Sequence, residues 1–229
     1  MTQHFREKIW TWFAKKTGLV NNTAWNRYHW KKYLEKEKSG SLKGAVGYDW
    51  GNPESADDRL GNYKKISFFL QEHINHHTRV VEIGSYGGKW TQYMSKAGHV
   101  TCVDLFEESF DFLKERIGTG MNLQFYKTRG DELEGIAAQS TDLVFSMDTF
   151  VRVPAGSIRK YFFEIFRVLK KGGEVLIHLP CREIPFCRRK AFTSISTDWI
   201  KRAAQEAGFE QFRLDFDILK HGILFFGSK

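Results

Sequence analysis

The sequence predicts an α/β protein with a doubly wound, mostly parallel sheet. From about residue 55 onward, amphipathic helical patterns alternate with short β-branched and apolar runs. Two strand patterns near the C-terminus, 212–219 and 222–227, have only Lys220-His221 between them, which is short enough for a hairpin with an antiparallel strand. The composition, 41% hydrophobic and 27% charged over 229 residues, is that of an ordinary globular chain with one large domain.

The individual elements follow from local spacing. Apolar residues at helical intervals predict helices at 60–74, 89–97, 107–117, 133–139, 157–169 and 197–207. Short apolar runs bounded by turn residues predict strands at 79–83, 100–104, 123–126, 142–147 and 174–179, before the two hairpin strands. Two of the helices end on glycine signals, Lys171-Gly172-Gly173 and Gly208.

The N-terminal segment differs from the rest of the chain in charge. Residues 1–43 hold ten Lys or Arg and three Asp or Glu, a net charge of +7, whereas 44–229 carry +1. Two Trp-containing helical patterns precede a Gly-rich stretch that ends near Pro53. We therefore predict a basic, aromatic-rich helical cap at 1–55 and the α/β domain at 56–229. A basic segment can meet nucleic acid, anionic lipid or an anionic substrate, or it can be a solvated face.

Several classes of protein are disfavoured. No apolar run approaches the roughly 20 residues of a membrane-spanning helix, and the N-terminus lacks the apolar stretch of a signal peptide. Three cysteines, Cys102, Cys181 and Cys187, do not make a disulfide framework and suit a reducing compartment. We expect a cytoplasmic protein without a transmembrane segment, and peripheral membrane contact stays open.

The segment Val81–Thr91 carries the strongest chemical signal. A buried strand pattern runs into a glycine-rich turn, Gly84-Ser85-Tyr86-Gly87-Gly88, which opens a helical pattern. Doubly wound sheets bind nucleotides at such turns, because glycine lets ligand atoms approach the backbone closely. A tight turn without a ligand would have the same sequence, so further signals are needed.

Acidic residues supply those signals. Glu82 stands just before the turn, Asp104 ends the next strand, and Gly130-Asp131 follows the third strand. An acid in the position of Asp104 can accept hydrogen bonds from both ribose hydroxyls. A pocket lined with acids suits a cationic cofactor and repels a pyrophosphate.

These features resemble the class I S-adenosylmethionine-dependent methyltransferases. The Gly-rich turn, the acid after the second strand, the Gly-Asp pair, Asp142–Asp148 and Ile165–Gly173 occur in that family's order. The resemblance implies a Rossmann-like seven-stranded sheet of order 3-2-1-4-5-7-6 with its last strand antiparallel, and S-adenosyl-L-methionine as cofactor. The implied cofactor-binding residues are Trp50, Glu82, Gly84, Ser85, Tyr86, Gly88, Asp104, Leu105, Gly130, Asp131 and Glu132.

Two positions depart from the family pattern. Tyr86 replaces the middle glycine of the turn, so the turn could be reshaped, with the ring against cofactor or substrate. Trp50–Glu54 and Trp90-Thr91 resemble a bacterial small-molecule or glycan subgroup, in which a histidine often follows the fourth strand; Arg152 stands there instead. Arg152 is a candidate for binding an anionic substrate, or a surface charge.

The resemblance implies methyl transfer to a small-molecule or glycan acceptor, which we expect to be methylated at oxygen. Asp148 and His178 close predicted strands and are the candidate general bases, although Asp148 could only shape the pocket and His178 could be structural. Rival interpretations are an RNA or nucleotide methyltransferase that uses the basic segment, and a non-catalytic interaction protein. His178, Cys181 and Cys187 could bind zinc, but only three ligands in one loop make a weak signal, so no metal is expected.

Overall fold

The computed structural model describes residues 32, 35–36, 39, 51–56, 59–190 and 192–229. The chain divides into two compact units, Met1–Val46 and Gly47–Lys229. Nearly all of the first unit lies outside the described residues, and so does Trp50, one of the expected cofactor contacts. The fold presented below is that of the second unit.

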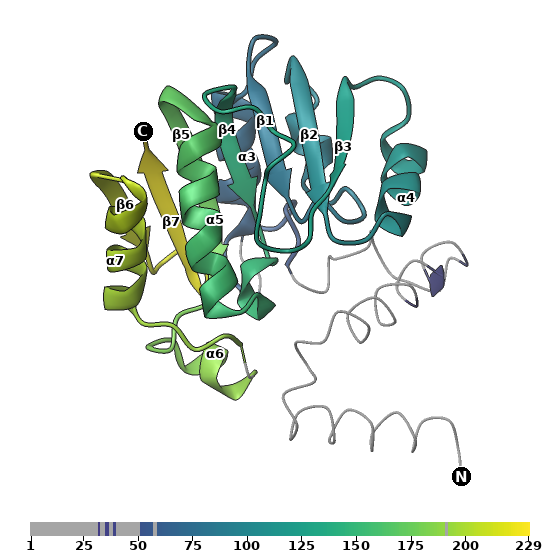
Figure 1. Cartoon of the computed structure of the whole chain (residues 1–229). Helices are drawn as coiled ribbons and strands as arrows, with labels where there is room; N and C mark the ends of the chain where they lie inside the picture. The colour runs from purple at the N-terminus through teal and green to yellow at the C-terminus, as the bar shows by residue number, and fades with distance from the viewer. Residues whose placement is uncertain (1–31, 33–34, 37–38, 40–50, 57–58, 191) are drawn as a thin grey trace. The chain divides into compact units, whose positions relative to one another are not determined.

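A seven-stranded sheet forms the centre of this unit, in the order β3-β2-β1-β4-β5-β7-β6 (Figure 1). Its strands are β1 (Arg79–Ile83), β2 (His99–Asp104), β3 (Leu123–Lys127), β4 (Thr141–Ser146), β5 (Leu169–Leu179), β6 (Gln211–Asp215) and β7 (Ile223–Ser228). Strand β7 is antiparallel to both β5 and β6, and the remaining neighbours are parallel. The predicted fold class and strand order are confirmed.

Helices cover both faces of the sheet. Alternation along β1 sends Val80 into one apolar cluster and Val81 into the other. The Val81 cluster includes α5 (Ala155–Val168) and α7 (Thr197–Ala207), which stand in front of the sheet in Figure 1, and the Val80 cluster includes α3 (Tyr63–His73) and α4 (Glu108–Ile117). Both faces are therefore buried, as the near-continuous apolar strand patterns require.

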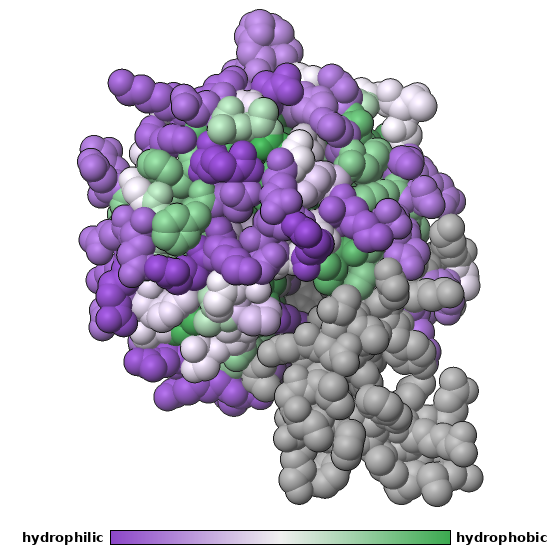
Figure 2. Space-filling view, in the orientation of Figure 1, coloured by the Kyte–Doolittle hydropathy of each residue, from purple (hydrophilic) through white to green (hydrophobic). Residues whose placement is uncertain are grey.

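The surface seen in Figure 2 is mostly hydrophilic, with small separate hydrophobic groups between polar side chains. Large apolar side chains that are exposed among the described residues include Phe68, Phe163 and Phe216. Among the helices that the structure describes, none combines the length and the apolar character needed to cross a membrane.

Two predicted helices are wrong. At 89–97 the chain forms only a short 3-10 helix, η3 (Thr91–Met94), and at 133–139 it forms turns. In the second case α5 takes the backbone groups that a helix would use. The Leu133 N–H donates to the Glu164 carboxylate at 2.8 Å, and Arg167 donates to the carbonyls of Leu133 and Ile136 at 2.8 and 2.9 Å. These tertiary contacts override the helical spacing.

The expected cap at Lys171-Gly172-Gly173 is also wrong, because α5 ends at Val168 and the chain enters β5 at Leu169. The glycines instead pair with the C-terminal residue: Gly172 N–H donates to the Lys229 carbonyl, and Lys229 N–H donates to the Gly173 carbonyl at 3.0 Å. The structure also contains two short helices that the sequence pattern does not predict, η4 (Phe150–Arg152) and α6 (Pro185–Arg189).

Candidate active site

The glycine-rich turn lies at the carboxyl end of β1, beside β2. The Gly84 and Ser85 N–H groups donate to the Val103 carbonyl at 2.7 and 3.2 Å, which ties the turn to the neighbouring strand. Gly84 and Gly88 both have φ of +76°, and Tyr86 has φ of +44°. Tyr86 thus keeps a left-handed backbone of the kind glycine permits, at a cost of about 1–2 kcal/mol for a residue with a side chain.

Asp104 holds this turn from the end of β2. Its carboxylate accepts hydrogen bonds from the Tyr86 N–H at 2.9 Å and from the Phe106 N–H at 3.0 Å. Burial raises the pKa of Asp104 to about 6, and no cation among the described residues pairs with it. A buried carboxylate with spare lone pairs and no cation beside a nucleotide-type turn fits a ligand that donates hydroxyl groups.

Glu82 lies beneath the turn. Only 2% of its surface is exposed, and the Thr91 hydroxyl donates to its Oε2 at 2.6 Å. Burial raises the pKa of Glu82 to about 8, so the group is mostly neutral at pH 7. Ser85 is buried as well. Glu82 thus supports the turn from within the protein, and Ser85 is a buried member of the turn itself.

The segment after β3 contributes the other predicted cofactor contacts. Gly130 has φ of +107°, and Leu105 lies beside it, since a Cβ at position 130 would come 3.6 Å from the Leu105 Cδ1. The Asp131 carboxylate pairs with the Lys160 ammonium at 2.6 Å. Burial raises the pKa of Glu132, but hydrogen bonds outweigh burial and hold this pKa below its usual range. The donors are the Tyr126 hydroxyl and the backbone N–H groups of residues 129 and 134.

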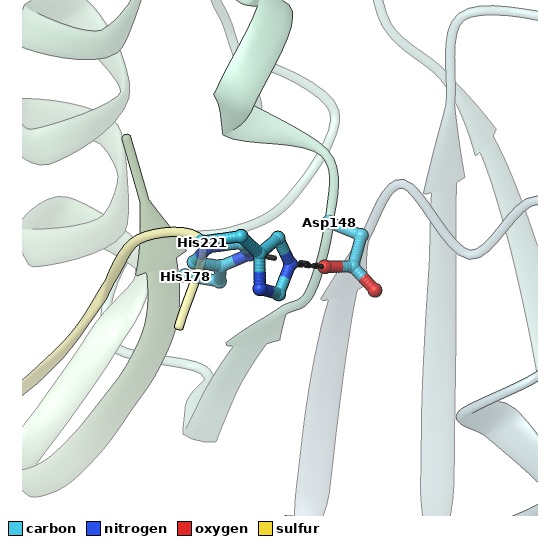
Figure 3. Close-up of side chains that lie close together, drawn as sticks. All are labelled: Asp148, His178 and His221. Carbon is cyan, nitrogen blue, oxygen red and sulfur yellow. Dashed lines mark hydrogen bonds and ion pairs between the residues drawn. The ribbon is translucent and has the colours of Figure 1, made fainter. Parts of the chain in front are cut away.

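A second cluster of polar side chains gathers where β4, β5 and β7 meet (Figure 3). Asp148 follows β4 with φ of +61°, His178 belongs to β5, and His221 precedes β7. The Asp148 Oδ1 lies 3.1 Å from His178 Nδ1 and 3.0 Å from His221 Nε2. Both imidazoles are fully buried, and 12% of the Asp148 side chain is exposed.

Lys89 and Tyr63 complete this second cluster. The Lys89 ammonium lies 3.0 Å from Asp148 Oδ2 and over the rings of Tyr63 and Trp90, at 5.2 and 5.3 Å from their centroids. The Tyr63 hydroxyl lies 3.3 Å from Asp148 Oδ1 and 3.0 Å from His221 Nε2. Lys89 directly follows the glycine turn, so it connects the turn with Asp148.

The neighbours of Asp148 determine its charge. Burial alone would raise its pKa, but Lys89, His178 and His221 hold it well below the usual range, so Asp148 is ionised. Burial, followed by the proximity of His221, lowers the pKa of His178 to about 4, so this ring is neutral at pH 7. A Cβ at Gly222 would overlap the His178 Nε2, so glycine there leaves room for the imidazole.

Arg152 lies in η4, with its guanidinium 5.7 Å from the centroid of the Phe192 ring. Burial lowers its pKa from the usual value. This stacking accounts for the side chain without a substrate, so its predicted role in substrate binding stays a prediction.

The sequence pattern does not single out three members of the second cluster. Lys89 is only the residue after the turn, and Tyr63 fits an apolar position of the predicted helix at 60–74. His221 lies in the predicted hairpin link. The available signal was weak: polar residues next to strand ends, at 89 and 221, with no spacing that joins them to 148 or 178.

Comparison with known proteins agrees with this geometry. Residues 80–173 match the profile of a family described as a methyltransferase domain. No curated protein sequence matches the chain significantly.

Solved structures with the same fold include three with relevant descriptions. A SAM-dependent methyltransferase from Aquifex aeolicus is 18% identical, with a TM-score of 0.59 over 78% of this chain and 94% of that one. A SAM-dependent methyltransferase from Methanosarcina mazei is 15% identical, with a TM-score of 0.57 over 70% of this chain and 96% of that one. Phosphoethanolamine N-methyltransferase 2 from Haemonchus contortus is 18% identical, with a TM-score of 0.61 over 80% of this chain and 56% of that one. At these identities the likeness shows the fold alone.

The family match covers the turn, Asp104 and Asp148, and the sheet has the strand order of the class I methyltransferases. Residues 80–173 are therefore similar to a methyltransferase domain, and the chain has the fold of the class I S-adenosylmethionine-dependent methyltransferases.

Proposed function

We propose that this domain methylates an oxygen atom of a small-molecule or glycan acceptor. The observation that carries the proposal is the position of Asp148, an ionised and partly exposed carboxylate. Its Oδ2 lies 3.0 Å from the ammonium of Lys89, the residue that directly follows the glycine turn. Ligands of doubly wound sheets bind beyond the carboxyl ends of the strands, where both the turn and Asp148 lie.

The residues around the turn would hold the cofactor. Asp104 offers lone pairs to the ribose hydroxyls, the Gly84–Gly88 backbone allows close approach, and Leu105 with Gly130 and Asp131 flanks the position of the base. The cofactor supplies a methyl group that its sulfonium already activates. The protein's own task is therefore mainly to orient the acceptor and to manage its proton.

The Asp148 cluster would serve the acceptor. A hydroxyl group must lose its proton on methylation, and the ionised Asp148 carboxylate would accept a hydrogen bond from that hydroxyl and orient it, with neutral His178 behind the carboxylate. Because Asp148 has the exposed surface and His178 has none, Asp148 would touch the acceptor and His178 would position Asp148.

The test is a transfer assay with methyl-labelled S-adenosylmethionine on pools of hydroxyl-bearing metabolites and glycans, and on RNA. We expect label in a low-mass or glycan product with the base stability of an ether. Asp148→Asn should lower turnover by about 10²–10⁴-fold with cofactor affinity retained. Asp142→Asn, the same change near the start of β4, is the matched control. Label on an amine would contradict the proposal.

The basic N-terminal segment supports a second candidate, an RNA or nucleotide acceptor. Its charge of +7 over residues 1–43 exceeds that of the whole remainder of the chain. Label on RNA, with binding that weakens steeply as salt rises, would favour this acceptor over the first. Cofactor binding without transfer to any acceptor would favour the interaction protein.

The proposal also includes a role for residues 1–55 as a lid over the cofactor and a cytoplasmic location for the protein. Residues 51–55 lie within the second unit, where Ser67 donates to the Pro53 carbonyl at 3.1 Å. All three cysteines are free and buried, which suits a reducing compartment.

A further inference from the structure

We propose that Asp148, His178 and His221 bind a divalent transition-metal ion of the zinc class. They offer two imidazole nitrogens and one carboxylate oxygen from three separate elements, and these atoms all lie within 4.8 Å of one another (Figure 3). Imidazole with carboxylate suits zinc and its first-row neighbours better than magnesium or calcium, which prefer oxygen ligands.

The spacing of the donor atoms fits such an ion. Bonds of about 2.0–2.2 Å place neighbouring ligands of a tetrahedral zinc ion roughly 3.3–3.5 Å apart. The Asp148 Oδ1 is 3.1 Å from His178 Nδ1 and 3.0 Å from His221 Nε2. These two distances are a few tenths of an ångström shorter than that spacing, and the two imidazole nitrogens lie within 4.8 Å of each other.

The contacts of His221 leave its Nε2 facing Asp148. Its Nδ1 lies 3.2 Å from the Leu60 carbonyl, which only accepts, so Nδ1 carries a proton. Nε2 lies 3.0 Å from the Asp148 Oδ1 and 3.0 Å from the Tyr63 hydroxyl. Nε2 and the carboxylate oxygen thus face each other, as two ligands of one ion would.

The surroundings resemble the outer shell of a metal site. Metal-binding histidines usually donate their second N–H to a carbonyl or carboxylate, as His221 does to Leu60, and ligating carboxylates are themselves hydrogen-bonded, as Asp148 is to Lys89. The Lys89 ammonium also lies over the faces of Tyr63 and Trp90, which stabilise its charge.

Three protein ligands leave a fourth position, as in catalytic zinc sites. If the proposed function holds, that position receives the acceptor hydroxyl, and the ion lowers its pKa. Only this role rests on the proposed function, because the site itself rests on the donor geometry.

The experiment measures Zn²⁺ and Co²⁺ binding to the full chain after chelation and dialysis, by titration calorimetry and visible absorption. We expect one ion per chain and d–d bands of low-coordinate cobalt without a thiolate band. His221→Gln and His178→Gln should each weaken binding by more than the roughly 10–100-fold that loss of an outer-shell partner costs. The control is the double change His76→Asn and His77→Asn, which removes two exposed imidazoles and should change nothing.

Absence of binding to the wild-type chain would overturn the site. A thiolate band, or loss of binding in the His76 and His77 variant alone, would also overturn it. The wild-type cobalt spectrum decides the matter even where a variant fails to fold. Cofactor binding, measured on the same metal-free sample, separates failure of this site from failure of the proposed function.

Discussion

Acids are buried at two places along the carboxyl edge of the sheet, and their ionisation differs. At the glycine turn, burial raises the pKa of Glu82 to about 8 and that of Asp104 to about 6. At the second cluster, Asp148 has a pKa well below its usual range despite burial. The turn holds its acids with Thr91 and backbone N–H groups, whereas the cluster holds Asp148 with Lys89 and two imidazoles.

This difference separates two tasks. An acid without a cation keeps its hydrogen-bonding capacity for a ligand that enters the turn. An acid surrounded by basic groups keeps its charge and is fixed in position. Burial alone therefore does not determine what an active-site carboxylate does, because its partners decide the sign of the pKa shift.

The substitution Lys89→Met tests this comparison with the largest expected effect, a loss of unfolding free energy. Removing one partner of a buried ion pair costs about 3–5 kcal/mol, because the remaining charge is left uncompensated. The Tyr63 hydroxyl and His178 Nδ1 still lie within hydrogen-bond distance of the Asp148 carboxylate, so we expect the lower end of that range. Urea denaturation of metal-free protein at pH 7 measures the loss of unfolding free energy.

The control for Lys89 is Lys160→Met, which breaks the exposed pair with Asp131, where the side chains are 67% and 30% exposed. Exposed pairs contribute less than about 1 kcal/mol. Equal losses in the two variants would mean that Asp148 does not depend on Lys89 for its charge.

The two places also differ in how far the sequence predicts them. The turn is local: Glu82 and the glycines lie within seven residues, and Asp104 ends the next strand, so strand patterns and spacing were enough. The second cluster joins positions 63, 89, 148, 178 and 221, which only the folded sheet brings together. The same reasoning explains the wrong helix at 133–139, since the backbone groups of Leu133 and Ile136 make tertiary hydrogen bonds that local spacing does not encode.

The next effect concerns pH and the turn. Glu82 holds its proton up to about pH 8 in the folded chain but only to its ordinary value of 4.5 when unfolded. Between these values the folded state binds more protons, so the free energy of unfolding falls as pH rises. Glu82→Gln should remove this part of the decrease in unfolding free energy. It amounts to up to about 3 kcal/mol between pH 6 and 8, at 1.36 kcal/mol per pKa unit.

Urea denaturation at pH 6, 7 and 8 measures this slope in wild type and variant. Glu72→Gln, on the exposed side of α3, is the control and should leave the slope as in wild type. Identical slopes for wild type and Glu82→Gln would show that Glu82 is already ionised at pH 6.

A smaller effect is expected on the affinity for the cofactor. Asp104→Ala removes a carboxylate that would accept the ribose hydroxyls, which costs about 1.5–3 kcal/mol of binding free energy, or roughly 10–100-fold in affinity. Calorimetry with S-adenosylmethionine checks this against Asp111→Ala on α4, where 86% of the side chain is exposed. Unchanged affinity in Asp104→Ala would reject its assignment to the cofactor.

The smallest effect isolates the backbone of the turn at Tyr86, whose φ is +44°. Tyr86→Gly and Tyr86→Ala both remove the ring, so the difference between them reports the backbone alone. Because alanine retains the left-handed strain that glycine lacks, the glycine variant should be more stable by about 1 kcal/mol. At Tyr93 in η3 the order should reverse, by roughly 0.5–1 kcal/mol, because glycine loses more conformational freedom there. Thermal melting of the four variants measures both differences. Alanine equal to or better than glycine at position 86 would mean that the turn relaxes to a new shape, and Asp104 would then lose the Tyr86 N–H that now holds it.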